Sequence, residues 1–403
     1  MNDGVLDHLI LGYGAVFDAK RKPGITRLTL HPTASAGQPD VPGLQDVLLQ
    51  HWQPNHGPLA LNLTSESWLR ALLQHLTEQG PVPQWQVEVP AFVLSDAALA
   101  SEVVELATRG QPFVLKGRPL SPLSPTLMRS FQCAIIEIDE DRRAPGAAPA
   151  GAPARTLPFV QAGAQTGADA AAAFGRGAVG VLGWPLGDPP EAGHRGKNLP
   201  AGVRVVMDLM QRLDREEPVG QLEAVLRRDP ALGYRLMRYI NSPGFGLSVE
   251  VNSFSHAIMI LGYTRLKRWL ALLMTGAIDN ADMRPLMFLA VRRGLLMEEL
   301  ARGLADEALR NEAFICGVFS LLDRMLGQSF EELLRSVPVP ERVAHALADQ
   351  TGELAPSLAL AVAIESGLPL DIQQADEAMM LTPGEANRAA LAALAASRQL
   401  QTD

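Results

Sequence analysis

Three basic residues fall at the carboxyl ends of predicted β-strands in the first half of the chain. They are Arg27, Lys116 and Arg118. In β/α folds ligands bind at these strand ends, and guanidinium or ammonium groups there can hold phosphates without a metal ion. The same charges can also be interpreted as solvated loop residues that bind nothing, and both hypotheses stay open.

Residues suited to metal chemistry are sparse. The eight histidines are scattered, with no His-x-x-x-His pair and no neighbouring cluster of Asp or Glu. Sites for divalent transition metals need imidazole and carboxylate donors. His256 lies in an apolar helix start, where it is interpreted as a packed or capping residue. The sequence therefore predicts no metal ion and no cofactor.

The elements that must position these residues alternate between strand and helix in the first half. Strand patterns cover residues 9–17, 25–30, 59–63, 85–89, 113–115, 134–138, 159–162 and 179–184. Helical patterns between them include 67–79 and 97–109. This rhythm predicts parallel strands with crossover helices.

The second half is predicted to be helical. Residues 143–155 are rich in Ala, Pro and Gly and indicate a surface insert, and residues 188–200 indicate an interdomain linker. Apolar residues at spacings of three and four then predict helices over 203–213, 219–228, 232–241, 255–261, 264–277, 285–304, 311–326, 330–336, 340–347, 354–366, 371–378 and 382–398.

Composition limits the class of protein. The chain has 403 residues, 47% hydrophobic and 20% charged, with a net charge of −9. These values are typical of a soluble multidomain protein and provide no general attraction to nucleic acid or anionic lipid. Cys133 and Cys316 lie in apolar runs and indicate buried reduced thiols, and no segment predicts a signal peptide or a membrane span. We expect a cytoplasmic protein.

A set of motif residues in the second half resembles the HDOD domain, a helical signalling module related to the HD phosphohydrolases. The family patterns D-P-x-L, N-S and A-I-x-x-L-G are matched by Asp229, Pro230, Asn241, Ser242, Ala257, Leu261 and Gly262. These residues also suit helix ends, because Asp caps amides, Pro starts a helix, and Asn and Gly accept left-handed backbone. Ser320 and Leu321 stand where the His and Asp of an HD metal centre would be. The resemblance thus implies a helical domain without that metal.

The HDOD module is often joined to an EAL domain, a (β/α)8-type barrel that hydrolyses cyclic di-GMP with two divalent metals. Residues 8–187 resemble this domain. In that register Asn62 and Glu88 match family residues, whereas Arg27 stands at the signature metal-binding Glu. Lys116 and Gly117 replace a pair of aspartates.

The later positions of the EAL pattern are also altered. Glu137 replaces a Lys while Asp139 is kept, Gln165 replaces a Glu, and Leu182 replaces a Gln. Two-metal hydrolysis needs clustered carboxylates, and fixed positive charge opposes bound cations. The resemblance therefore implies a degenerate barrel without catalysis.

The resemblance predicts a bacterial signal-transduction protein with three segments. A degenerate EAL-type barrel covers 1–187, a linker covers 188–200, and an all-α HDOD domain covers 201–403. We expect it to act by protein–protein contact with partners that the sequence does not name. The alternatives are an effector that binds cyclic di-GMP without hydrolysis and a phosphodiesterase with an atypical site. By analogy with related barrels, a homodimer is also open.

Overall fold

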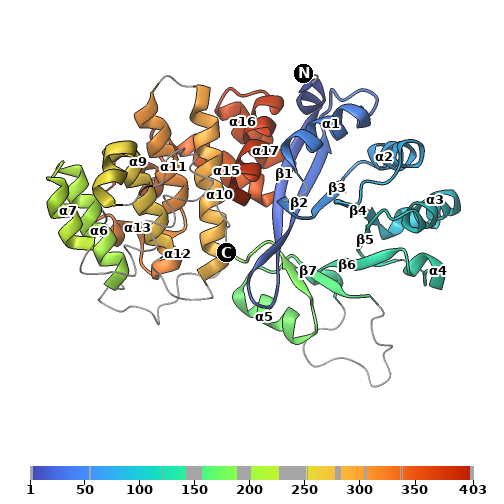
Figure 1. The fold of residues 1–403 in the computed structure, drawn as a ribbon. Helices are drawn as coiled ribbons and strands as arrows, with labels where there is room; N and C mark the ends of the chain where they lie inside the picture. The colour runs from blue at the N-terminus through green and yellow to red at the C-terminus, as the bar shows by residue number, and fades with distance from the viewer. Residues whose placement is uncertain are drawn as a thin grey trace. The chain divides into compact units, whose positions relative to one another are not determined.

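The computed structural model describes residues 3–53, 56–119, 121–141, 157–187, 201–226, 251, 253–276, 283–303, 306–335, 337 and 339–399. They divide into two compact units (Figure 1). The first is Met1–Asp188 with Ala363–Arg388, and the second is Pro189–Val362 with Ala389–Asp403. The expected boundaries differ from this division at Ala363–Arg388, which we call the C-terminal arm and which packs with the first part of the chain.

The first unit is built on a closed barrel of eight strands in sequential order. The strands are β1 (Leu9–Phe17), β2 (Pro23–Pro32), β3 (Leu59–Leu63), β4 (Trp85–Pro90), β5 (Phe113–Lys116), β6 (Phe131–Glu137), β7 (Phe159–Ala162) and β8 (Gly180–Leu182). Each overlaps a strand predicted from the sequence. The expected barrel fold is confirmed.

Strand direction differs from the prediction at one place. Neighbours from β2 to β8 are parallel, but β1 is antiparallel to both β2 and β8. A parallel pair needs a crossover of about a dozen residues or more. Only residues 18–22 join β1 to β2, so this connection makes a hairpin.

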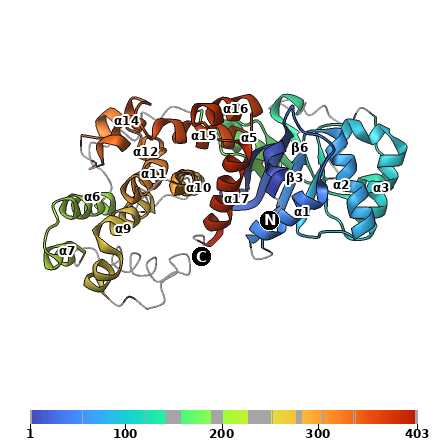
Figure 2. The same ribbon diagram turned by 90° about the horizontal axis from the view of Figure 1, so that it is seen from above.

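Helices of the first unit lie outside the barrel (Figure 2). They are α1 (Val41–His51), α2 (Glu66–Gln79), α3 (Ala97–Thr108), α4 (Pro125–Met128) and α5 (Gly167–Gly175), with short 3-10 turns η1 (Asp3–His8), η3 (Ala91–Ser95) and η4 (Ile138–Glu140). The buried stripe of α2, from Trp68 to Leu76, faces the strands. Alternation along each strand sends the other set of side chains to the interior.

The C-terminal arm consists of the end of α15 (Ala355–Ser366), all of α16 (Pro369–Ala378) and the start of α17 (Pro383–Gln399). Within the first unit, α16 packs against β1. Both α15 and α17 also contribute residues to the second unit. The arm is therefore connected at both ends to the helical part of the chain.

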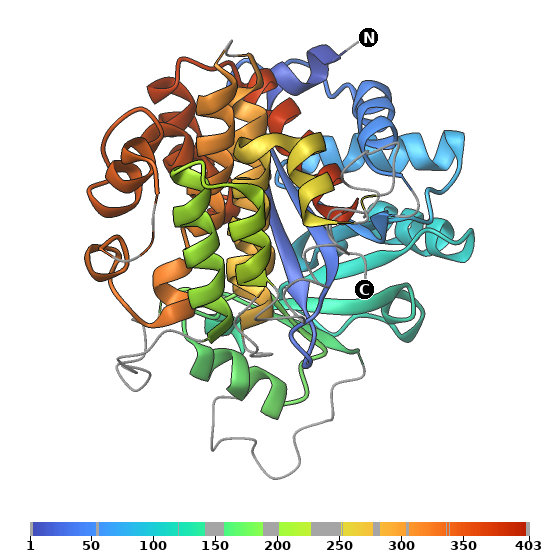
Figure 3. The ribbon, with the colours of Figure 1, turned by 60° about the vertical axis from the view of Figure 1, so that its left-hand side comes forward.

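The described part of the second unit is helical, as expected. Its helices are α6 (Ala201–Asp214), α7 (Val219–Leu226), α9 (Phe254–Gly276), α10 (Arg284–Leu300), α11 (Glu307–Phe319), α12 (Leu322–Leu326), α13 (Phe330–Leu333) and α14 (Glu341–Ala348). Figure 3 shows α6 and α7 side by side, and both of these helices contact α9. None of the described helices is both long and apolar enough to span a bilayer.

Two glycines bring α10 and α11 into close contact. A Cβ on Gly294 would lie 2.9 Å from the carbonyl oxygen of Phe314, and one on Gly317 would overlap the backbone of Arg293 and Gly294. Side chains at either position would push the helices apart. This crossing fixes the positions of the residues that follow Gly317, which include Ser320 and Leu321.

Candidate functional site

Two pairs of polar side chains meet inside the barrel. Arg27 on β2 donates from Nε to Oε1 of Glu88 at 2.6 Å and from Nη2 to Oε2 at 2.7 Å. Lys116 on β5 donates to Oδ1 of Asn62 on β3 at 3.0 Å. In each pair another strand lies between the partners. Such side chains meet across the interior face, so these four predicted site residues are brought together there.

Both members of the Arg27–Glu88 pair are largely removed from water. The side chain of Glu88 is 0% exposed and that of Arg27 is 16% exposed. Burial lowers the pKa of the Arg27 guanidinium, but the carboxylate of Glu88 outweighs this effect and raises it. Two parallel charge-assisted hydrogen bonds are the strongest form of such a pair. Glu88 is therefore neutralised by a side chain and not held ready for a cation.

The ammonium of Lys116 differs from the Arg27 guanidinium in its pKa shift and its partners. Burial, and then repulsion from Arg27, lowers the pKa of Lys116. The amide of Asn62, which accepts from Lys116, donates from Nδ2 to Oγ1 of Thr29 at 3.3 Å. An ammonium has three N–H donors, so Lys116 with its amide partner keeps donors for an anion. Arg27, by contrast, already uses two of its donors on Glu88.

His31 belongs to the same end of the barrel and was not predicted from the sequence. Its Nδ1 lies 3.2 Å from Oγ1 of Thr64, and its Nε2 lies 3.0 Å from the carbonyl oxygen of Gly367 in the C-terminal arm. Burial lowers the pKa of the imidazole, with smaller contributions from Lys116 and Arg27. The alternation that places Arg27 in the interior also selects His31, four residues later, which is the signal that could have found it.

The remaining charged positions lie around the ends of β5 and β6. Gly117 has a φ of +76°, and after it Arg118 donates to the carbonyl oxygen of Glu140 at 3.3 Å. Asp139 lies exposed in the turn after β6. Partial desolvation raises the pKa of Glu137, against the attraction of Arg27 and Lys116. Arg118 and Asp139 therefore line the rim and not the interior.

Two predicted positions are separate from this cluster. Gln165 is exposed and its side chain donates to the carbonyl oxygen of Gly163 at 3.4 Å. Leu182 packs with Val16 and Val160 in the apolar part of the barrel interior. Neither residue offers a group to the polar pairs.

These donors do not fit a pair of divalent metals. Such a site needs several carboxylates around the cations, but the interior carboxylate of Glu88 is held by a guanidinium, with Lys116 close by. No three His, Cys, Asp or Glu side chains gather as metal ligands among the residues that the structure describes. No metal-dependent step is assigned to this barrel.

In the helical unit an arginine of α10 lies beside Ser320. The hydroxyl of Ser320 donates to the carbonyl oxygen of Gly317 at 2.7 Å and lies 3.2 Å from Nη1 of Arg293. Leu321 is buried. Arg293 was missed by sequence reasoning because it lies on α10, 27 residues before Ser320. A serine, a leucine and a guanidinium cannot coordinate a cation usefully.

The HDOD motif residues are described only in part. Ala257 and Leu261 are buried on α9, and Gly262 has a φ of +72° that interrupts the helix. This break separates the two helices that the sequence predicts at 255–261 and 264–277. Asp229, Pro230, Asn241 and Ser242 lie outside the described residues.

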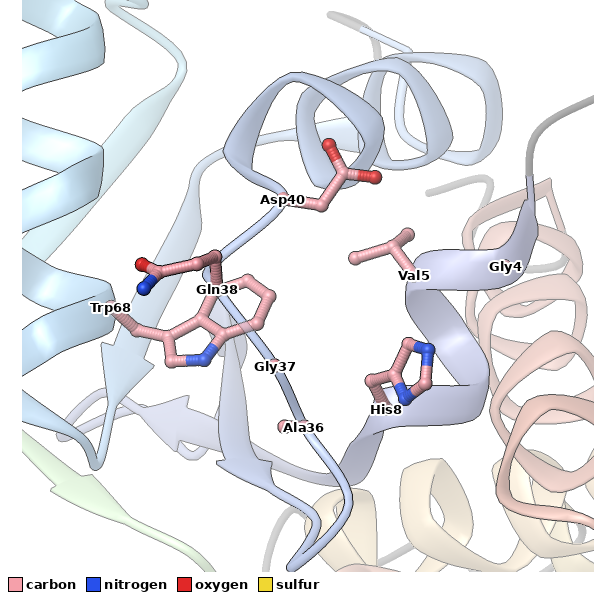
Figure 4. A pocket seen from close by; sticks show the side chains of 8 residues that line it. All are labelled: Gly4, Val5, His8, Ala36, Gly37, Gln38, Asp40 and Trp68. Atoms are coloured by element: carbon pink, nitrogen blue, oxygen red, sulfur yellow. The ribbon is translucent and has the colours of Figure 1, made fainter.

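A surface pocket lies beside the start of β1 (Figure 4). Its volume is about 350 Å³, and its lining includes His8, Gln38, Asp40 and Trp68. The carboxylate of Asp40 accepts from the amide of Gly43 at 3.0 Å and thereby caps α1. The one carboxylate that lines this pocket therefore serves as a helix cap.

Known proteins match parts of the chain. Residues 199–333 match the family model of the HDOD domain, so the predicted HDOD domain is confirmed. The cyclic di-GMP phosphodiesterase CdgJ of Vibrio cholerae is 31% identical over 134 residues, which are 33% of this chain and 31% of that protein. The uncharacterized protein YuxH of Bacillus subtilis is 28% identical over 163 residues, 40% of each chain. The chain thus matches less than half the length of these relatives.

Two solved structures have some likeness to the chain. One is the PaMucR phosphodiesterase in complex with c-di-GMP, with a TM-score of 0.31 and 18% identity, covering 45% of this chain and 96% of that one. The other is the EAL enzyme Bd1971 bound to cAMP and cyclic di-GMP, with a TM-score of 0.28 and 9% identity, covering 45% of this chain and 62% of that one.

Proposed function

We propose that the chain is a signalling protein of the cyclic-di-GMP system that does not hydrolyse the nucleotide. In this proposal an EAL-type barrel is joined to an HDOD module that acts through protein contacts. The HDOD match and the relative named as a cyclic di-GMP phosphodiesterase support the pathway. The closed eight-stranded barrel and the EAL-like order of residues support the barrel assignment.

The buried Arg27–Glu88 ion pair carries the proposal that catalysis is absent. A guanidinium lies inside the barrel, with the ammonium of Lys116 beside it. Two positive side chains oppose a divalent cation at the same place, by several kcal/mol at moderate screening. Without cations to polarise the phosphate and activate water, the carboxylates at the rim have no partner for the chemistry.

A hydrolysis assay on the purified protein tests this function. We expect no turnover of cyclic di-GMP with magnesium or manganese. The Arg27→Glu variant should stay inactive as well, because Lys116 and Gly117 still stand where two carboxylates are needed. Turnover by the wild-type protein that a chelator abolishes would instead support a phosphodiesterase with an atypical site.

A second candidate function is binding of cyclic di-GMP without hydrolysis. Lys116 has one amide partner in the interior, and Arg118 lies exposed at the rim. Both groups can hold phosphate oxygens without a metal. Calorimetry with cyclic di-GMP tests this function, and Lys116→Ala and Arg118→Ala should each weaken any binding. Arg109→Ala is the control, since Arg109 precedes β5 at the opposite end of the strands.

A further inference from the structure

The edge of β1 is only partly covered by the sheet. Strand β8 has three residues and pairs with β1 only at Val16 and Phe17. One further bond, from the amide of Gly183 to the carbonyl oxygen of Ala15 at 2.8 Å, extends this contact. Toward its start, β1 therefore has backbone groups on this side that β8 does not reach. A strand edge of this kind is a template for another segment.

One side chain of the C-terminal arm bonds to three backbone groups at the start of β1 and just before it. Oδ1 of Asn387 on α17 accepts from the amide of Leu11 at 3.0 Å. Its Nδ2 donates to the carbonyl oxygens of Leu9 and Leu6, both at 2.8 Å. Asn387 is 3% exposed. A carboxamide suits this role because it carries both an acceptor and two donors, as the edge itself does.

The turn between α15 and α16 makes a second contact with β1. A Cβ on Gly12 would lie 2.6 Å from Cα of Gly367, which is closer than real side chains come. Gly12 shares its strand face with Val16, which packs in the barrel interior. The turn therefore approaches β1 from the interior side, where the Gly367 carbonyl meets His31.

A third contact lies at the start of α17. A Cβ on Gly384 would overlap the carboxylate of Asp7 in η1. A carboxylate beside the first turn of a helix is stabilised by the unpaired amides there. The arm thus meets η1, β1 and β2, each through a polar or glycine contact.

We propose that the C-terminal arm is a releasable docking element that covers the part of the β1 edge that β8 does not reach and the barrel mouth beside His31. The occupant of this edge is the chain's own Ala363–Arg388. Because α15 and α17 continue into the second unit, release of the arm is a change that the helical unit can produce or sense. The proposal does not depend on whether the barrel binds or hydrolyses a nucleotide.

Hydrogen exchange at single amides of the full chain tests this proposal. In the wild-type protein, the amides of α16 and of Leu11 should exchange together and at least tenfold faster than those of β3 to β5, as a separately opening unit does. If Leu11 and α16 exchange only together with β3 to β5, the arm is a fixed part of the barrel and the proposal is wrong.

A pair of matched variants tests whether the contact between Gly12 and Gly367 holds the arm on β1. Gly12→Ala should speed exchange of Leu11 and α16 by a further tenfold or more, because the new methyl group displaces Gly367. Gly14→Ala is the control, since its Cβ would meet only Cδ1 of Leu182 at 3.5 Å, and it should exchange as the wild-type protein does. Equal exchange in the two variants would overturn the proposal.

If Gly12→Ala fails to fold, a second variant tests whether the arm holds the edge of β1. Asn387→Ala removes the acceptor for Leu11 and should expose that amide, while β3 to β5 remain protected. Asn311→Ala is its control, because the Asn311 side chain donates within its own helix to the carbonyl oxygen of Glu307 at 2.8 Å. A Leu11 amide that stays as protected in Asn387→Ala as in Asn311→Ala would show that the arm does not hold this edge.

Discussion

The guanidinium of Arg27 donates hydrogen bonds to both oxygens of the Glu88 carboxylate, at 2.6 and 2.7 Å. This contact joins β2 to β4 across the interior over the intervening β3. Glu88 has no exposed side-chain surface, so its charge depends on Arg27 for compensation. The barrel interior thus contains an ion pair that links these two strands.

Arg27→Ala should therefore destabilise the protein strongly. It leaves the Glu88 carboxylate buried without a partner, which typically costs about 3–5 kcal/mol. Urea unfolding followed by circular dichroism measures the loss. The double variant Arg27→Met, Glu88→Leu is the control and should regain most of the stability, because apolar pairs of similar volume often replace buried ion pairs without cost. If Arg27→Ala is as stable as the wild-type protein, the buried charge of Glu88 does not need Arg27 as a partner.

Most of the barrel could be predicted from hydrophobic periodicity. Strands β1, β3 and β7 have the bounds that the sequence indicates, because each is a buried run with clear ends. β6 begins three residues before the expected 134, at Phe131, since the partly exposed Gln132 and Cys133 hide its start. β8 is shorter than expected, and Gly183, with a φ of +71°, follows its last residue.

Contacts between distant positions could not be predicted in this way. Leu11 and Asn387 are 376 residues apart, and nothing local in either segment specifies the other. Arg27 and Glu88 were both named as site positions, but their pairing follows from strand order and tilt, which periodicity does not give. The HDOD half was recognised by its motif, and that recognition is confirmed.

The two cysteines should be unreactive in the folded protein. Burial raises the pKa of Cys133 to about 11 and that of Cys316 to about 12. Since the thiolate is the reactive form, a disulfide reagent at pH 8 should label neither within minutes. In denaturant both should react at once. Rapid labelling of the native protein would contradict the raised pKa values of these two thiols.

Gly262 should be required for the break within α9. Its φ of +72° lies in the left-handed region, and a Cβ there would have open space around it. Gly262→Ala should therefore cost about 1–2 kcal/mol from backbone strain alone. Gly220→Ala in α7 is the control, because Gly220 also has open space but no positive φ. That change should be neutral or stabilising by up to about 1 kcal/mol. If the unfolding midpoints of Gly262→Ala and Gly220→Ala shift by the same amount, the break within α9 does not require a glycine at 262.

Asp376 on α16 should make stability fall as pH rises. It is 5% exposed, its Oδ1 has no hydrogen-bond partner among the described residues, and burial raises its pKa to about 7. An unfolded Asp releases its proton near pH 4. Between about pH 4 and 7 the native state therefore binds more protons than the unfolded state, so the free energy of unfolding decreases with pH in that window.

Asp376→Asn should remove this dependence, because the amide resembles the protonated carboxyl. We expect the variant to match the wild-type protein at pH 4.5 and to exceed it at pH 8 by on the order of 1 kcal/mol or more. Asp371→Asn is the control on the same helix, since Asp371 is exposed. Its effect should be small and the same at both pH values. Thermal melts across this range measure the slopes. A wild-type slope that survives in Asp376→Asn would assign the pH dependence to another group.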